Sequence, residues 1–362
     1  MTEIYQGFGQ NGYQLAYQLL EEMNLNLDAD FKVGLKPNLV LAKESAQGAT
    51  TDPQLTAGVI AYLKEQGIED IVIMEGSWVG ANTESAFKEC GYQELAQKYD
   101  IELYNLKYDQ TRKLTSGDLT LEVCQAALEV DYLINLPVLK AHCQTKMTCA
   151  LKNLKGCIPD SEKRRYHTLG LHEPIAHLNN VLKSDLTIVD GIIGDLTFEE
   201  GGNPVHMNRV LAGFDPVLID TYVAQLLGLK LEEVPYIQLA AELGVGSSSL
   251  NSEQVVKINQ AEESETDNLS AGRKVEHLKQ YINESQACSA CLGSLIHALQ
   301  RCQDNHQLPS KEEVYIGQGW QGLAKEGLGI GNCTQQCTAF VPGCPPTAAQ
   351  IRDKLIAYWN LD

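Results

Sequence analysis

The chain has little positive charge and no long apolar run. Its 362 residues carry 28 lysines and arginines against 47 aspartates and glutamates, a formal net charge of −19. This balance argues against nucleic acid as the main partner, because phosphate binding requires a cationic surface. The start, MTEIYQGFGQNG, lacks the basic and apolar segments of a secretion signal, and no stretch is apolar for long enough to span a bilayer. We therefore expect a cytoplasmic protein that does not insert into membranes.

A disulfide framework is also not expected. The chain has 11 cysteines, an odd number, and a reducing compartment keeps thiols free. Metal or redox chemistry is the better interpretation. The cysteines of the last quarter of the chain are Cys288, Cys291, Cys302, Cys333, Cys337 and Cys344.

Alternating strand and helix patterns predict an α/β fold. Residues 31–37 form an apolar strand pattern, a helix pattern follows Asp52, and a second strand pattern ends near Gly76. Asp52 or Thr51 can cap this helix, whose first turn holds Pro53. Further strand patterns lie at 101–106, 131–137 and 185–191, and further helix patterns lie at 82–91 and from Asp215. We expect a mainly parallel open sheet with flanking helices.

The composition becomes polar near residue 246, where GSSSLNSEQ and then AEESETDNLSAG contain few core-forming residues. This predicts an α/β domain over 1–246, a polar linker over 247–272 and a smaller cysteine-rich domain over 273–362.

The C-terminal cysteines have the spacing of metal ligands. Cys288 and Cys291 form a CxxC pair, which can direct two thiolates at one metal or cluster. Cys333, Cys337 and Cys344 offer the further soft ligands. Zinc is the alternative, although it more often takes two closely spaced pairs. The proline after Cys344 stiffens its loop and suits an iron–sulfur cluster.

ACSACLGSL, GLGIGNC and VPGCPPTAAQI resemble the iron–sulfur segment of nickel–iron hydrogenase small subunits and of the quinone-side cluster subunit of the respiratory NADH dehydrogenase. The resemblance covers about the last 75 residues. It implies a 4Fe-4S cluster held by Cys288, Cys291, Cys333 and Cys344, with Cys337 as the alternate to Cys333.

A basic, histidine-rich segment lies in the first domain. Residues 138–183 hold eight lysines and arginines against three acidic residues, together with four of the 8 histidines. A solvated helix face would explain the lysines but not the histidines. We therefore expect this segment to bind an anionic small molecule.

Several polar residues follow predicted parallel strands, at the edge where open sheets bind ligands. Proton transfer is assigned to Lys140, His142, Glu75 and Asp190, although capping is an alternative for the two carboxylates. Substrate binding is assigned to Lys36, Lys146, Lys152 and Asn153. Lys146, Cys149 and Asn153 have the spacing of one helical face, and Gly156 would end that helix.

VGLKPNLV, TTDP, LPVLKAHCQTKMTCALKNLKGCIP and LTIVDGIIG resemble an uncharacterised family, domain of unknown function 362, over about residues 30–225. Members often carry an iron–sulfur module after this domain. The name of the family states no reaction.

Three functions agree with these patterns. The first is a redox enzyme or electron-transfer protein in which the cluster exchanges electrons with a partner protein or with the bound anion. The second is a non-redox enzyme in which one iron of the cluster acts as a Lewis acid. The third is a small-molecule-binding protein whose C-terminal domain is merely stabilised by metal. Whether the chain is an enzyme, and if so an iron–sulfur oxidoreductase, stays open at this point.

Overall fold

The computed structural model describes residues 3–260, 269, 273–310 and 312–360. The chain divides into two compact units. The first consists of Met1–Lys163 and Leu171–Ala271, and the second of Arg164–Gly170 and Gly272–Asp362.

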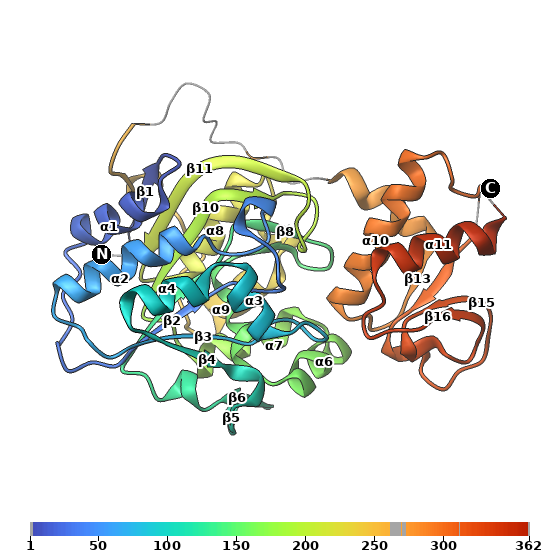
Figure 1. The fold of residues 1–362 in the computed structure, drawn as a ribbon, viewed down its shortest axis with the longest axis horizontal. Coiled ribbons are helices and arrows are strands. Elements are labelled where there is room, and N and C mark those ends of the chain that lie inside the picture. The colour runs from blue at the N-terminus through green and yellow to red at the C-terminus, as the bar shows by residue number, and fades with distance from the viewer. Residues whose placement is uncertain (1–2, 261–268, 270–272, 311, 361–362) are drawn as a thin grey trace. The chain divides into compact units, whose positions relative to one another are not determined.

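The first unit contains an eight-stranded sheet, and five of its seven strand pairs are parallel (Figure 1). Only β11 pairs antiparallel, with both of its neighbours. The predicted mainly parallel open sheet is thus confirmed. In spatial order the strands are β12 (Val255–Lys257), β1 (Ile4–Phe8), β11 (Pro204–Gly213), β10 (Leu186–Asp195), β7 (Tyr132–Leu136), β2 (Val33–Pro37), β3 (Ile71–Glu75) and β4 (Glu102–Asn105).

The helices begin at the caps that the sequence indicates. The Asp52 carboxylate accepts the N–H of Gln54 at 2.9 Å, and helix α2 starts at Pro53. Asp215 caps α8 in the same way through the N–H groups of Val217 and Leu218. The helices that lie wholly within the first unit are α1 (Gly12–Glu22), α2 (Pro53–Glu65), α3 (Thr83–Glu89), α4 (Tyr92–Tyr99), α5 (Ala150–Asn153), α7 (His172–Val181), α8 (Pro216–Leu226) and α9 (Pro235–Glu242).

One face of the large sheet buries apolar side chains, and the other face buries polar ones. Ile134 and Leu136 join an apolar core with residues of α1 to α4. Asn135 lies between them and points to the other face, because side chains alternate along a strand. There its amide donates to the carbonyl of Ala150 and accepts from Asn153, at the two ends of α5. This second face carries the polar groups of the candidate site.

The prediction of one helix that carries Lys146, Cys149 and Asn153 on one face is wrong. Lys146–Thr148 is a strand, β9, which pairs antiparallel with β8 (Lys140–His142). Lys146 has a φ of +67°, which no helix allows. Helix α5 starts only at Ala150, because the buried Asp220 carboxylate accepts the N–H of Ala150 at 2.8 Å and of Leu151 at 3.2 Å. Gly156 does not end a helix but lies within a 3-10 turn, Leu154–Cys157.

Part of the segment 247–272, predicted as a polar linker, is a strand, and its residues 261–268 and 270–272 lie outside the described residues. Its residues Val255–Lys257 form β12, which pairs parallel with β1 at the edge of the large sheet. The polar composition around this short strand reflects its edge position, where few side chains are buried.

The second unit has its own sheet and helix pair. Four parallel strands run in the order β13 (Ile282–Glu284), β14 (Val314–Ile316), β15 (Lys325–Ile330) and β16 (Cys337–Val341). Helices α10 (Ser289–Asp304) and α11 (Ala348–Trp359) pack against each other (Figure 1). A capping box of Thr347 and Gln350 begins α11. Helix α6 (Asp160–Leu169) contributes its residues from Arg164 onward to this unit.

Candidate functional site

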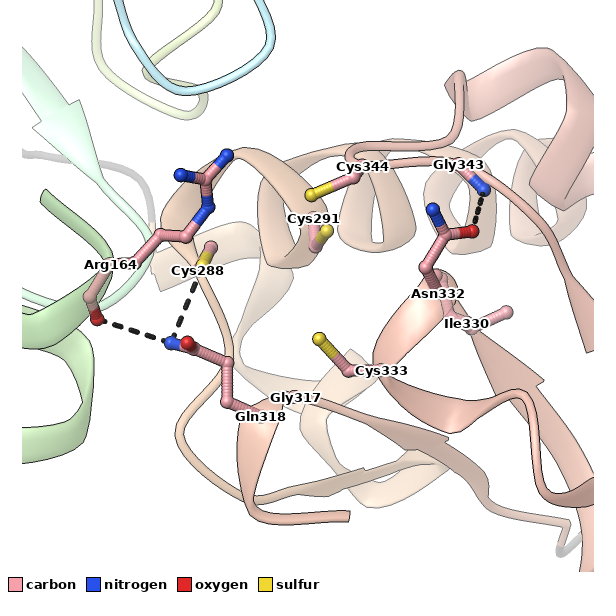
Figure 2. A pocket seen from close by; sticks show the side chains of 11 residues that line it. Arg164, Cys288, Cys291, Gly317, Gln318, Ile330, Asn332, Cys333, Gly343 and Cys344 are labelled. Atoms are coloured by element: carbon pink, nitrogen blue, oxygen red, sulfur yellow. Dashed lines mark hydrogen bonds between the residues drawn. The ribbon is translucent and has the colours of Figure 1, made fainter. Parts of the chain in front are cut away.

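Four cysteines from three segments of the second unit line one pocket (Figure 2). Cys288 is the N-cap of α10 and Cys291 lies in its first turn. Cys333 lies in a 3-10 turn after β15, and Cys344 follows β16. Cys288, Cys291 and Cys333 are half-buried and Cys344 is exposed. In Figure 2 the sulfurs of Cys291, Cys333 and Cys344 point toward one another.

Two hydrogen bonds between Asn332 and Gly343 hold the two loops of this pocket together. The N–H of Asn332 donates to the carbonyl of Gly343 at 2.9 Å, and the Asn332 side-chain oxygen accepts the N–H of Gly343 at 2.8 Å. Gly331 has a φ of +87°, which disfavours any residue with a side chain. A Cβ there would also lie 3.6 Å from Cys291 Sγ. The glycine therefore brings the backbone beside the sulfurs.

The thiols raise one another's pKa. Burial raises the pKa of Cys291, and the neighbouring Cys288, Cys344 and Cys333 raise it further. Burial also raises the pKa of Cys333, whereas the Arg164 guanidinium opposes the shift. Four thiolates here need a cationic group among them.

Gln318 adds a donor to the pocket. Its side-chain N–H₂ lies 3.7 Å from Cys288 Sγ and donates to the Arg164 carbonyl at 3.1 Å. Amide donors to ligating sulfurs tune the potential of a metal centre.

The other C-terminal cysteines lie elsewhere. Cys337 is buried at the start of β16 and Cys302 is buried within α10, and neither lines this pocket. The structure therefore brings Cys333, rather than Cys337, to the other three cysteines.

In the first unit, Lys36 and Glu75 form a buried ion pair where β2 and β3 end. Lys36 Nζ lies 2.9 Å from Glu75 Oε1, and their side chains are 0% and 4% exposed. Glu75 also accepts the N–H of Leu39 at 2.6 Å and of Gly76 at 2.7 Å. A Cβ on Gly156 would lie 2.3 Å from Glu75 Oε1, so only glycine fits over the pair. The pair therefore joins the two strand ends, and the turn after α5 packs closely over it.

A chain of buried amides continues from this pair to Lys140. Asn153 donates to the Lys36 carbonyl and accepts from Asn38 at 3.0 Å. Lys140 in turn donates to Asn38 Oδ1 at 3.2 Å and to the Ala49 carbonyl. Burial, helped by Lys152, lowers the pKa of Lys140 to about 7. Lys140 can therefore exist as a neutral amine near neutral pH.

Asp190 lies in the middle of β10, not at its end as the sequence pattern suggests, because β10 continues to Asp195. Its pairing with the antiparallel β11 extends the strand past the parallel contacts with β7. The carboxylate accepts the N–H of Asp52 at 2.8 Å and of Ile192 at 3.1 Å, and burial raises its pKa to about 7. Asp190 thus joins the start of α2 to the sheet.

His142 belongs to a separate group with residues that the sequence reasoning missed. Its Nε2 lies 3.5 Å from Glu199 Oε1, and Cys143 Sγ lies 3.3 Å from the same oxygen. Glu200 lies beside them, and burial and Glu199 raise its pKa to about 8. The stretch LTFEEGGN is indistinguishable from a solvated loop in sequence. Only the fold reveals that two adjacent carboxyl groups of this stretch, those of Glu199 and Glu200, are buried, and this burial marks the stretch as a candidate site.

The two other lysines predicted to bind substrate are Lys146, in β9, and Lys152, in α5. Lys146 is half-buried, and its backbone lies opposite that of His142 in the β8–β9 hairpin. Lys152 is half-buried in α5, its Nζ lies 3.3 Å from Thr148 Oγ1, and burial lowers its pKa to about 8. The structure therefore gathers Lys36, Glu75, Asn153 and Lys140 in one network and places His142 with Glu199.

The fold and these sites define an α/β protein with a small second unit that carries a four-cysteine pocket. The chain belongs to the family described as Domain of unknown function (DUF362), whose model matches residues 33–225. The match runs from β2 to α8 and includes the buried Lys36–Glu75 pair and the His142–Glu199 group.

The chain is also similar to individual proteins. It is 26% identical over 229 residues to the "Thylakoid-associated protein sll1697" of Synechocystis sp., a match that covers 60% of this chain and 70% of that protein. The lactate racemase apoprotein from Thermoanaerobacterium thermosaccharolyticum matches with a TM-score of 0.40 and 10% identity, covering 58% of this chain and 54% of that one. A protein from Thermotoga maritima matches with a TM-score of 0.38 and 13% identity, covering 65% and 60%. The chain thus spans less than two thirds of either solved structure.

Within the part of the chain that the structure describes, no helix combines the length and the apolar character needed to cross a bilayer.

Proposed function

We propose that this chain is an iron–sulfur protein that transfers electrons, with a 4Fe-4S cluster held by Cys288, Cys291, Cys333 and Cys344. The convergence of these four cysteines on one pocket carries the proposal. Four soft ligands, a glycine-lined backbone beside them and an amide donor on Cys288 fit such a cluster. When bound, the cluster supplies a one-electron carrier; the cysteines hold it and Gln318 orients Cys288.

Zinc is the alternative occupant of this pocket. It more often takes two closely spaced pairs of ligands, whereas Cys333 and Cys344 do not form such a pair in the sequence.

The metal and sulfide content of the anaerobically purified chain tests the cluster. We expect about four irons and four sulfides per chain, with an electron paramagnetic resonance signal that appears on dithionite reduction. Zinc without inorganic sulfide would contradict the proposal. A cluster that dithionite does not reduce would favour the Lewis-acid or purely stabilising roles instead.

The first unit is proposed to bind an anionic small molecule, which would be the substrate of an iron–sulfur oxidoreductase. Lys152 supports this assignment, because its pKa, lowered by burial to about 8, still leaves it mainly an ammonium at neutral pH, and an ammonium is a strong donor to carboxylates or phosphates. Lys152 is half-buried and can reach a ligand. His142 and the protonated Glu200 could supply proton transfer. A redox partner protein would then complete the electron path.

Replacing Lys152 by glutamine is expected to weaken anion binding at least tenfold, because the variant loses one charge of the anion site. Binding can be measured by thermal shift and calorimetry with inorganic phosphate and malonate as probes. Lys183→Gln is the matched control, since Lys183 lies in the same basic segment but follows α7. Equal affinity of the two variants for both probes would contradict the assignment of Lys152.

We also propose a cytoplasmic location. All eleven cysteines are free, as a reducing compartment allows.

A further inference from the structure

Arg164 places a positive charge at the four-cysteine pocket. It lies in α6, belongs to the second unit and lines the pocket with the four cysteines. Among the described residues that line the pocket, Arg164 is the one with a cationic side chain. Figure 2 shows that this side chain points away from its own helix and toward the cysteines. A guanidinium group therefore faces the place where four sulfurs meet.

The backbone of Arg164 is held close to these sulfurs. Gln318 Nε2 donates to the Arg164 carbonyl at 3.1 Å and lies 3.7 Å from Cys288 Sγ. One amide group thus contacts both the residue that carries the charge and a cysteine of the pocket. This double contact fixes the distance between Arg164 and Cys288.

The loop that carries Gln318 is closely packed. It follows β14, and the N–H of Gly319 donates to the Ser285 carbonyl at 3.0 Å. Gly317 has a φ of +117°, and a Cβ there would lie 2.0 Å from the same carbonyl oxygen. A Cβ on Gly319 would lie 2.0 Å from Ser285 Oγ. Because only glycine fits at both positions, the packing determines where the Gln318 amide lies.

The charge of Arg164 acts on the thiols. It lowers the pKa of Cys333 against the effect of burial, which raises it. The Arg164 side chain is half-buried, so water screens its charge only in part. Arg164 therefore favours negative charge in the pocket.

The remainder of the chain has the opposite effect. Adding one electron to a group with four thiolate ligands makes that group more negative, and the formal net charge of −19 disfavours this step. A fixed cation beside the sulfurs stabilises the more negative of two redox states.

We propose that Arg164 raises the reduction potential of the four-cysteine centre by placing a guanidinium charge beside its sulfurs. This inference rests on the proposed function, because it requires a redox-active cluster in the pocket. Arg164 acts through space and is not a ligand. No bond forms or breaks on reduction, the electron comes from the reductant, and the guanidinium keeps its protons.

A redox titration of the anaerobically purified full-length chain tests this role, with dithionite as the reductant and the paramagnetic signal as the readout. In Arg164→Gln we expect the iron and sulfide contents of the parent. The equilibrium constant for reduction should fall about tenfold, which for a one-electron couple lowers the midpoint potential by about 59 mV.

Two further variants make the result specific to this charge. Arg165→Gln is the matched control, because Arg165 is the next residue of α6 and is also half-buried but does not line the pocket. Its equilibrium constant for reduction should fall by less than about threefold, since screening weakens a more distant charge. Arg164→Lys keeps the charge and should restore most of the parent potential. A lysine variant with the potential of Arg164→Gln would contradict an effect of charge.

Failure of this proposal is distinguishable from failure of the cluster. If Arg164→Gln keeps its iron and its midpoint falls no further than that of Arg165→Gln, the role of Arg164 is overturned and the cluster stands. Loss of iron from Arg164→Gln would also overturn it, because Arg164 would then hold the pocket together rather than set its potential. If the parent contains zinc without inorganic sulfide, or a cluster that dithionite does not reduce, this proposal fails together with the proposed function.

Discussion

A chain with Cys291→Ser is expected to lose the proposed iron–sulfur cluster. Cys291 is the thiol whose pKa is shifted by all three of the other pocket cysteines, so it lies at the centre of the group. Serine offers a harder and more weakly coordinating oxygen in place of the soft sulfur. We expect iron content after anaerobic purification to fall at least fivefold, together with visible absorbance and the paramagnetic signal of the reduced protein.

Cys337→Ser is the matched control, because Cys337 is buried in the same unit and was the alternate ligand in the sequence. It should retain full iron content, since Cys337 does not line the pocket. Iron loss from a folded Cys337→Ser protein would mean that Cys337 and not Cys333 is the third ligand. Full iron content in Cys291→Ser would remove the cluster from this pocket.

Replacing Lys36 by methionine is expected to destabilise the first unit by about 3–5 kcal/mol, because the change leaves the Glu75 charge buried without its cation. The remaining partners of Glu75, the N–H groups of Leu39 and Gly76, do not neutralise it. The loss can be measured by urea unfolding, with hydrogen exchange of β2 and β3 to assign it to this unit.

The double variant Lys36→Met with Glu75→Gln is the control. A neutral glutamine can keep an acceptor for the two N–H groups, so the double variant should be more stable than Lys36→Met alone. A single variant that loses less than about 1 kcal/mol would show that the pair is not a structural element. Both proteins should keep the proposed cluster, since the four cysteines proposed to hold it lie in the second unit.

Local signals sufficed for several helices and strands of the first unit. Asp52 and Pro53 indicate the start of α2 because a cap and a proline act within one turn of the chain. The apolar runs that became β2, β3 and β7 were identifiable because a strand buried on both faces is apolar throughout. The same reasoning failed at Lys146–Asn153, where Asp220, some 70 residues further on, decides where the helix begins.

Some residues of the candidate sites could also be identified from local sequence signals, whereas others could not. The spacing and prolines of the C-terminal cysteines are local, so the sequence could single these residues out as candidate ligands, but it left Cys333 and Cys337 as alternatives. Glu199 and Glu200 could not, because two acidic residues before GlyGly carry no sign of burial. Lys36 and Glu75 were identified as strand-end residues, but their pairing with each other required the neighbouring order of β2 and β3.

The sequence by itself determined the α/β class, the starts of α2 and α8 and the cysteines that could hold a metal, because caps, strand patterns and ligand spacing act over a few residues. Only the tertiary structure decided which thiols meet in one pocket, that Lys36 neutralises Glu75, and that His142, Cys143 and Glu199 converge. Those outcomes depend on contacts between segments far apart in the chain, whose burial changes the chemistry of each side chain.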